Sequence, residues 1–194
     1  MRAPDRQRLR LSSGTELSFI TAGEPSKPAL LLLHGTPQSA RYFRDVVPEL
    51  SDVAYVIAPD LPGFGESGVL PAASFPAYGE SVSELLGRLG IGPRYIYLHD
   101  FGAPVGFHIA MEAPELVLGL IVQNANAHRT GLGPQWGPVL AYGSKPDPES
   151  EAAAIAHLTF EGMRDTYLRD VPPDVAARIP AHSWEEDWRV MQLP

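Results

Sequence analysis

Apolar residues along the chain gather in short unbroken runs that are separated by longer stretches of mixed character. A continuous apolar run of strand length is typical of a strand that is covered on both faces of a parallel sheet. The chain contains four such candidate strands, at residues 29–33, 53–58, 95–98 and 116–122.

A different pattern precedes them. Leu9 and Leu11 alternate with polar residues, the segment "SSG" is a turn signal, and the alternation resumes with Leu17 and Phe19. Alternation with a period of two predicts an antiparallel hairpin with one buried face.

Helical spacing fills two of the intervals between the runs. Apolar residues from Phe75 to Leu89 follow helical spacing and stop at Gly90, and residues 103–113 carry a second apolar face that stops at Pro114. Strands and helices in alternation predict an α/β fold with a doubly wound, mostly parallel sheet.

Strand signals cease in the last third of the chain. Asp147, directly before a proline, marks a helix start, and Ser183 and Glu186 have the spacing of a capping box. We therefore expect a sheet-containing core over residues 1–126 and a helical region over residues 127–194.

Composition narrows the classes of partner. The chain has 194 residues, 44% of them apolar, which is enough for a real core. Its 23 acidic and 15 basic residues give a net charge of -8, which disfavours nucleic acid and anionic membrane surfaces. No apolar run approaches the roughly 20 residues of a membrane helix, and no signal peptide is recognisable. Cysteine is absent, so no thiolate metal site is possible, and we expect no cofactor, no metal and a cytoplasmic location.

Three motifs follow the predicted strands in order. In "LLLHGTPQS" a strand ends at a His-Gly pair, and Gly35 lets the backbone turn so that the Thr36 amide can face the end of the strand. In "APDLPGFGESG" Asp60 lies in the loop after the next strand. In "YIYLHDFGAPVGFHIA" Asp100 lies between a strand and a helix, with Gly102 two places later, as in a nucleophile elbow. The alternative interpretation is that Asp100 only caps the helix.

In this order the motifs resemble the α/β-hydrolase fold family, and within it the branch with an aspartate nucleophile that includes epoxide hydrolases and haloalkane dehalogenases. The resemblance covers residues 10–126, and the helical region looks like the cap of such enzymes. It implies that Asp100 attacks a carbon to form an alkyl-enzyme ester, which water then cleaves. It also implies an oxyanion hole made by the amides of Thr36 and Phe101. The loop that supports this hole comprises His34, Gly35 and Pro37.

The resemblance also bears on the substrate. Dehalogenases of the family typically hold the halide with a Trp after the nucleophile and an Asn-type donor after His-Gly, where this chain has Phe101 and Thr36. The sequence "HGTP" is closer to the His-Gly-X-Pro pattern of epoxide hydrolases. A small apolar epoxide is therefore the expected substrate, and a haloalkane is the alternative.

Epoxide opening in this family uses a cap tyrosine as proton donor. Tyr142 is the first candidate and Tyr167 a weaker one, and Trp136 is expected to line the substrate pocket. Alternatively, these aromatic residues only pack the helical region.

The family pattern includes an acid and a histidine after the cap, and these 194 residues contain no "D/E…GH" ending. His128, His157 and His182 are expected to be surface residues, and His99 should point away from the site. Three explanations stay open: a fragment of a longer hydrolase, a chain completed by a complementing chain or a second copy, and a catalytically inactive binding module. Without further strands, residues 116–122 form an exposed apolar sheet edge.

Overall fold

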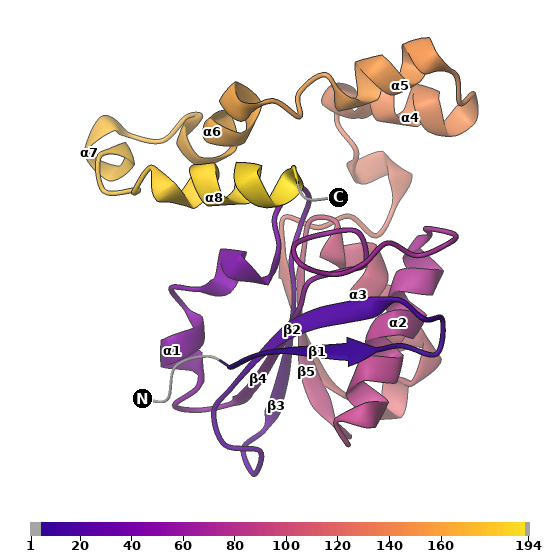
Figure 1. Cartoon of the computed structure of the whole chain (residues 1–194), viewed down its shortest axis with the longest axis vertical. Coiled ribbons are helices and arrows are strands. Elements are labelled where there is room, and N and C mark those ends of the chain that lie inside the picture. Colours follow the sequence, from indigo (N-terminus) through magenta and orange to yellow (C-terminus); the bar gives the residue numbers. More distant parts are fainter. Residues whose placement is uncertain (1–4, 193–194) are drawn as a thin grey trace. The chain divides into compact units, whose positions relative to one another are not determined.

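A computed structural model describes residues 5–192, and these residues form two compact units. The first unit extends to Ala127 and contains the whole sheet, whereas the second begins at His128 and contains helices only (Figure 1). Each unit packs around buried apolar side chains of its own.

The first unit is built on a mixed sheet of six strands in the order β1-β2-β4-β3-β5-β6. β1 and β2 form an antiparallel hairpin and β2 is antiparallel to β4, while β4, β3, β5 and β6 run parallel. The predicted hairpin and the predicted mostly parallel α/β sheet are both confirmed. The strands are β1 (Asp5–Arg10), β2 (Glu16–Ala22), β3 (Ala29–Leu33), β4 (Tyr55–Pro59), β5 (Arg94–His99) and β6 (Val117–Gln123).

Helical segments lie on both faces of the sheet (Figure 1). On one face, Leu31 and Leu33 of β3 share a core with residues of α2 and α3, and on the other face Leu30 and Leu32 pack with residues of η1 and α1. Because alternate leucines face opposite sides, a strand buried on both faces needs an unbroken apolar run. The helical segments of this unit are η1 (Ala40–Phe43), α1 (Val47–Leu50), α2 (Phe75–Arg88), α3 (Gly102–Glu112) and η2 (Pro114–Leu116).

The strand β6 lies at one edge of the sheet. Residues 116–122 were expected to be covered on both faces, and this expectation is wrong, because Leu118, Leu120, Ile121 and Val122 are between 42% and 56% exposed. Among the six strands described, only β5 pairs with β6. The expected exposed apolar edge is confirmed.

The second unit consists of short helices. The predicted helix start at Asp147 is confirmed, since its carboxylate accepts from the Ser150 amide at 2.9 Å. The predicted capping box at Ser183 is wrong, because α8 already begins at His182 and Ser183 lies inside the helix. None of the helices in the described part of the chain is long and apolar enough to cross a membrane. The helical segments are η3 (Arg129–Gly131), η4 (Pro134–Trp136), α4 (Gly137–Ser144), α5 (Pro148–Ile155), α6 (Phe160–Leu168), α7 (Pro173–Ala176) and α8 (His182–Met191).

Candidate active site

Asp100 lies in a tight turn between β5 and α3. Its backbone φ is +46°, in the left-handed region that residues other than glycine rarely adopt. Such a conformation costs on the order of 1–3 kcal/mol and persists only where surrounding contacts impose it. One such contact is at Gly102, where a Cβ would lie 2.7 Å from the His34 carbonyl oxygen. The close approach of α3 to β3 therefore requires a residue without a side chain two places after Asp100, as in a nucleophile elbow.

The Asp100 carboxylate is directed to the loop after β3 and not to its own helix. Its Oδ1 accepts a hydrogen bond of 2.9 Å from the Thr36 amide. The N-cap position of α3 is Phe101, and within residues 5–192 no side chain caps this helix. The alternative interpretation of Asp100 as a helix cap is therefore wrong. Gly35 leaves room for the carboxylate, since a Cβ there would lie 2.7 Å from Oδ1.

The two amides expected to form an oxyanion hole come from different loops: Thr36 lies in the loop after β3, and Phe101 directly follows Asp100. Thr36 donates to it directly and precedes Pro37 through a cis peptide bond. The Phe101 amide donates none of the hydrogen bonds described for this unit, and it lies where α3 begins. The unpaired N–H groups at a helix start carry partial positive charge. Both amides can therefore oppose negative charge that develops on Asp100.

His34 is fully buried beneath this loop. Its Nε2 accepts from the Leu61 amide at 2.9 Å, which leaves Nδ1 to donate to the Gly35 carbonyl oxygen at 2.8 Å. Burial lowers the pKa of His34, so the ring is neutral near pH 7. With both ring nitrogens occupied, His34 joins the loop after β3 to the loop after β4 and has no free nitrogen for proton transfer.

Asp60 joins the same loops through a second set of contacts. Its Oδ1 accepts from the Ala40 amide at 2.8 Å, and its Oδ2 accepts from Arg6 Nη1 at 2.6 Å and from the Glu66 amide at 3.0 Å. The carboxylate is fully buried, and Gly65 packs on it so closely that a Cβ would lie 2.4 Å from its Cγ. Sequence reasoning missed Arg6. The available signal was Asp60 itself, since a buried carboxylate needs a cationic or N–H partner.

Aromatic side chains gather around Phe101. Its ring lies 4.8 Å from the ring of Phe75, 5.5 Å from that of Phe64 and 6.3 Å from that of Tyr78, measured between centroids. These residues come from α2 and from the loop after β4. Sequence reasoning did not assign Phe64 or Phe75 to the site, and they give the residue after Asp100 an apolar surrounding.

A second aromatic contact lies on the other side of the elbow. Tyr42 of η1 stacks on His99, with ring centroids 5.1 Å apart and planes 2° from parallel. The Nδ1 of His99 lies 3.2 Å from the Gln123 carbonyl oxygen. Burial, and then the negative charge of Asp100, raise the pKa of Tyr42. Tyr42, which the sequence did not single out, thus packs on the residue directly before Asp100.

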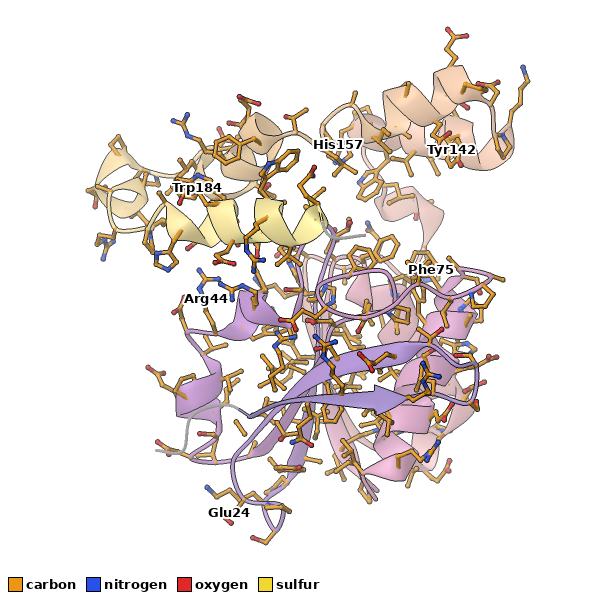
Figure 2. All side chains as sticks on the ribbon, viewed as in Figure 1. Glu24, Arg44, Phe75, Tyr142, His157 and Trp184 are labelled. Carbon is orange, nitrogen blue, oxygen red and sulfur yellow. The ribbon has the colours of Figure 1, made fainter. Side chains whose placement is uncertain are left out.

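The remaining candidate residues belong to the helical unit (Figure 2). Tyr142 is half-buried on α4, and the described histidines of this unit, His128, His157 and His182, are exposed. The Tyr167 hydroxyl donates to the buried Asp187 carboxylate. This contact gives Tyr167 a role in packing α6 against α8.

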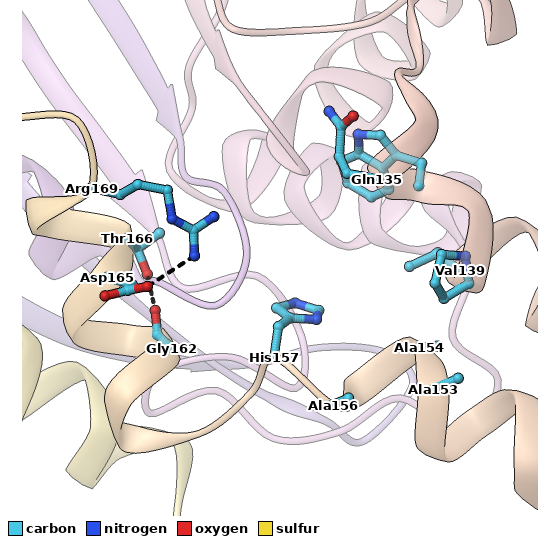
Figure 3. Close-up of a pocket in the computed structure, with 12 residues that line it drawn as sticks. Gln135, Val139, Ala153, Ala154, Ala156, His157, Gly162, Asp165, Thr166 and Arg169 are labelled. Atoms are coloured by element: carbon cyan, nitrogen blue, oxygen red, sulfur yellow. Dashed lines mark hydrogen bonds and ion pairs between the residues drawn. The ribbon is translucent and has the colours of Figure 1, made fainter.

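Trp136 is half-buried at the end of η4 and lines a hollow of about 580 Å³ within the helical unit (Figure 3). The structure thus places Thr36, Phe101 and the His34 loop around Asp100, and places Trp136 and Tyr142 in the other unit. Among the described residues, no three side chains of His, Asp or Glu gather as metal ligands.

Comparison with known families agrees with this arrangement. A sequence model of the alpha/beta hydrolase fold matches residues 28–193. The chain belongs to the α/β-hydrolase fold family. The resemblance to this fold family, drawn from the order of the motifs, is thereby confirmed.

The chain is similar to named members of this family along part of their length. It is 38% identical to an uncharacterized hydrolase of Saccharomyces cerevisiae over 179 residues, which are 90% of this chain and 62% of that protein. It is 34% identical over 108 residues to a haloalkane dehalogenase of Bradyrhizobium diazoefficiens, covering 55% of this chain and 35% of that one. The structure of the epoxide hydrolase CorEH superposes with a TM-score of 0.77 at 27% identity, covering 98% of this chain and 69% of that one. The chain thus spans under two thirds of the length of both relatives matched by sequence.

In this α/β hydrolase, the loops after β3, β4 and β5 carry the residues just described. These strands are parallel, so their carboxyl ends meet at one edge of the sheet, where ligands of open α/β sheets bind. Asp100 is the carboxylate at this edge that is half-exposed, whereas Asp60 is fully buried and already accepts three hydrogen bonds. Asp100 is therefore the better placed of the two to react.

Proposed function

We propose that this α/β hydrolase uses Asp100 as a nucleophile that opens an epoxide through an alkyl-enzyme ester. The observation that carries the proposal is the hydrogen bond from the Thr36 amide to Asp100 Oδ1, at a strained turn where the carboxylate does not cap the helix. A carboxylate is ionised at neutral pH and can attack carbon without a base.

In the first step, a carboxylate oxygen of Asp100 forms a bond to an epoxide carbon while the bond from that carbon to the epoxide oxygen breaks. The resulting alkoxide takes a proton from a donor, and we propose Tyr142 of the helical unit for this role. Residues 127–194 then serve as the cap, and Trp136 contributes an apolar wall for the substrate. The products of the step are a neutral ester on Asp100 and a free hydroxyl on the substrate.

In the second step, water adds to the ester carbonyl carbon, and negative charge develops on an Asp100 oxygen. The Thr36 and Phe101 amides stabilise this charge. One such donor typically lowers the activation barrier by about 3 kcal/mol. A base must remove the proton of the water. His34 cannot serve, because it is buried and both of its nitrogens are in hydrogen bonds. With no base assigned among these residues, we expect the ester to accumulate.

The apolar surrounding of Phe101 supports a small apolar substrate. An epoxide is preferred because the chain has Phe101 and Thr36 where dehalogenases of the family hold the halide, and because of its likeness to CorEH. A haloalkane is the second candidate, supported by the relative from Bradyrhizobium diazoefficiens. A binding module without turnover, completion by another chain or a second copy, and a cytoplasmic location stay predictions.

The intact mass of the protein, recorded before and after exposure to terminal epoxides and short haloalkanes, tests the proposal. An epoxide adds its whole mass to Asp100, whereas a haloalkane adds only its alkyl group, because halide leaves. We expect an epoxide adduct that maps to Asp100 and is absent from Asp100→Asn. Asp45→Asn is the matched control, because this carboxylate is 82% exposed and lies outside the elbow. A folded protein that forms no adduct with either class of reagent contradicts the proposal and favours the binding module.

A further inference from the structure

The hollow in the helical unit is large enough to hold a small molecule. Its volume of about 580 Å³ lies within the range of roughly 300–1,000 Å³ that small-molecule sites occupy. All of its lining residues belong to this unit, between Gln135 and Arg169. Figure 3 shows α4 and α5 on one side and α6 on the other, with His157 between them.

One side of the hollow is apolar and shaped by small residues. Trp136 and Val139 line it, together with the small side chains of Ala153 and Ala154 of α5. Gly162 lets α6 begin close to the segment before it, since a Cβ there would lie 1.9 Å from the His157 carbonyl oxygen. An indole ring in an apolar lining can pack against the ring of an aromatic molecule.

Some polar side chains around the hollow already form hydrogen bonds or ion pairs, and others form none of those described. The Asp165 carboxylate is paired with Arg169 at 3.0 Å, and the Thr166 hydroxyl donates to the Gly162 carbonyl oxygen at 3.0 Å. The side chains of Gln135 and His157 are exposed and take part in none of the contacts described for residues 5–192. The free groups thus include N–H donors, and the one carboxylate in the lining already has a partner. A ligand that carries an acceptor oxygen matches this arrangement.

We propose that the hollow binds a small flat aromatic molecule with a carbonyl oxygen. The ring lies against Trp136 and Val139, and the oxygen accepts hydrogen bonds from Gln135 and His157. The proposal goes beyond the reaction at Asp100: Trp136 is also the proposed substrate wall, but binding in the hollow does not require the Asp100 carboxylate. The same affinity is therefore expected for Asp100→Asn, whether or not Asp100 forms an ester.

A matched pair of probes tests the proposal on the full 194-residue chain. 2-Acetylnaphthalene carries the carbonyl, and 2-ethylnaphthalene has nearly the same shape without it. Titration followed by ¹⁵N–¹H NMR is expected to shift the amides of Ala153, Ala154 and Gly162 with the acetyl compound. The ethyl compound is expected to bind roughly three- to tenfold more weakly, as expected for the loss of one or two neutral hydrogen bonds.

Two kinds of variant complete the test. Ala153→Trp fills the hollow and is expected to weaken binding at least tenfold, whereas Ala152→Trp, an exposed neighbour outside the lining, leaves it unchanged. His157→Phe keeps a ring but removes the N–H donor. It is therefore expected to weaken the binding of the acetyl compound and to leave the binding of the ethyl compound unchanged. If Ala153→Trp binds as the wild type does, or if no amide of the hollow shifts at the solubility limit, the site is refuted. Equal affinity for the two probes refutes the role of the donors.

Discussion

The buried contacts of Asp60 lead to a sharp prediction for Asp60→Asn. An asparagine keeps one acceptor oxygen but places an NH₂ group where the second carboxylate oxygen was. In one orientation this NH₂ faces the Ala40 amide, and in the other it faces Arg6 and the Glu66 amide. Either way a donor meets a donor, and Arg6 loses its nearest carboxylate partner while it keeps Glu66, whose Oε1 lies 3.6 Å from Arg6 Nε.

Removing one partner of a buried ion pair typically costs about 3–5 kcal/mol of unfolding free energy. Arg6 is 26% exposed, so water can reach part of the guanidinium and reduce the cost. We therefore expect the lower end, about 3 kcal/mol. Urea denaturation measures the change, and Asp45→Asn is the matched control. Its carboxylate is 82% exposed and lies 3.5 Å from Arg44 Nε, so its loss should cost less than about 1 kcal/mol.

The reasoning is refuted if Asp60→Asn and Asp45→Asn change the unfolding free energy by similar amounts. A second readout follows from the position of Asp60. Because its Oδ1 holds the Ala40 amide, the loop that carries Thr36 depends on it. Asp60→Asn, studied well below its denaturation midpoint, is therefore expected to slow the alkylation of Asp100 as well.

Three further predictions concern other features. Burial lowers the pKa of His34 in the folded chain, so the unfolded chain takes up the proton first as the pH falls below its ordinary value of 6.5. Stability is therefore expected to fall from pH 7.5 to pH 5.5, and His34→Gln should show a smaller fall in the urea midpoint; an equal fall contradicts the assignment. Gly102→Ala places a Cβ 2.7 Å from backbone oxygen and should lower the free energy of unfolding by about 1–3 kcal/mol, measured by thermal denaturation. Gly87→Ala, with open space in α2, is the control and should be neutral or stabilising. Leu120→Lys on β6 is expected to lower the apparent mass in concentration-dependent light scattering, and an unchanged mass argues against association through this strand.

The sequence predicted the parts of the fold that depend on local pattern. The run at Ala29–Leu33 is apolar without interruption because both faces of β3 are covered, and such a run can be recognised from one sequence. The turn at Asp100 was recognisable because the close approach of α3 requires the glycine at 102. Both signals arise from residues that are near one another along the chain.

The features that the sequence did not predict depend on partners distant along the chain. The contact of Arg6 with Asp60 joins residues 54 positions apart and reaches past β2, so only the register of the sheet reveals it. At residues 116–122 the apolar run by itself predicted a covered strand, and this was wrong because the run carries no information on the strands and helices beside it. At Ser183 the capping-box spacing was present, but the same spacing also occurs inside a helix, where it caps nothing.

Among the described strands, the two edges of the sheet differ in their side chains. β1 carries charged side chains along its length, and Arg8 is paired with Glu16 and Glu66, whereas β6 is apolar and open. Charged edges resist pairing with another strand. If two copies pair through β6 about a twofold axis, both β6 edges are covered, and each outer edge of the joined sheet is a charged β1 strand. We therefore predict that any association through β6 would stop at two copies and would not continue into a fibre.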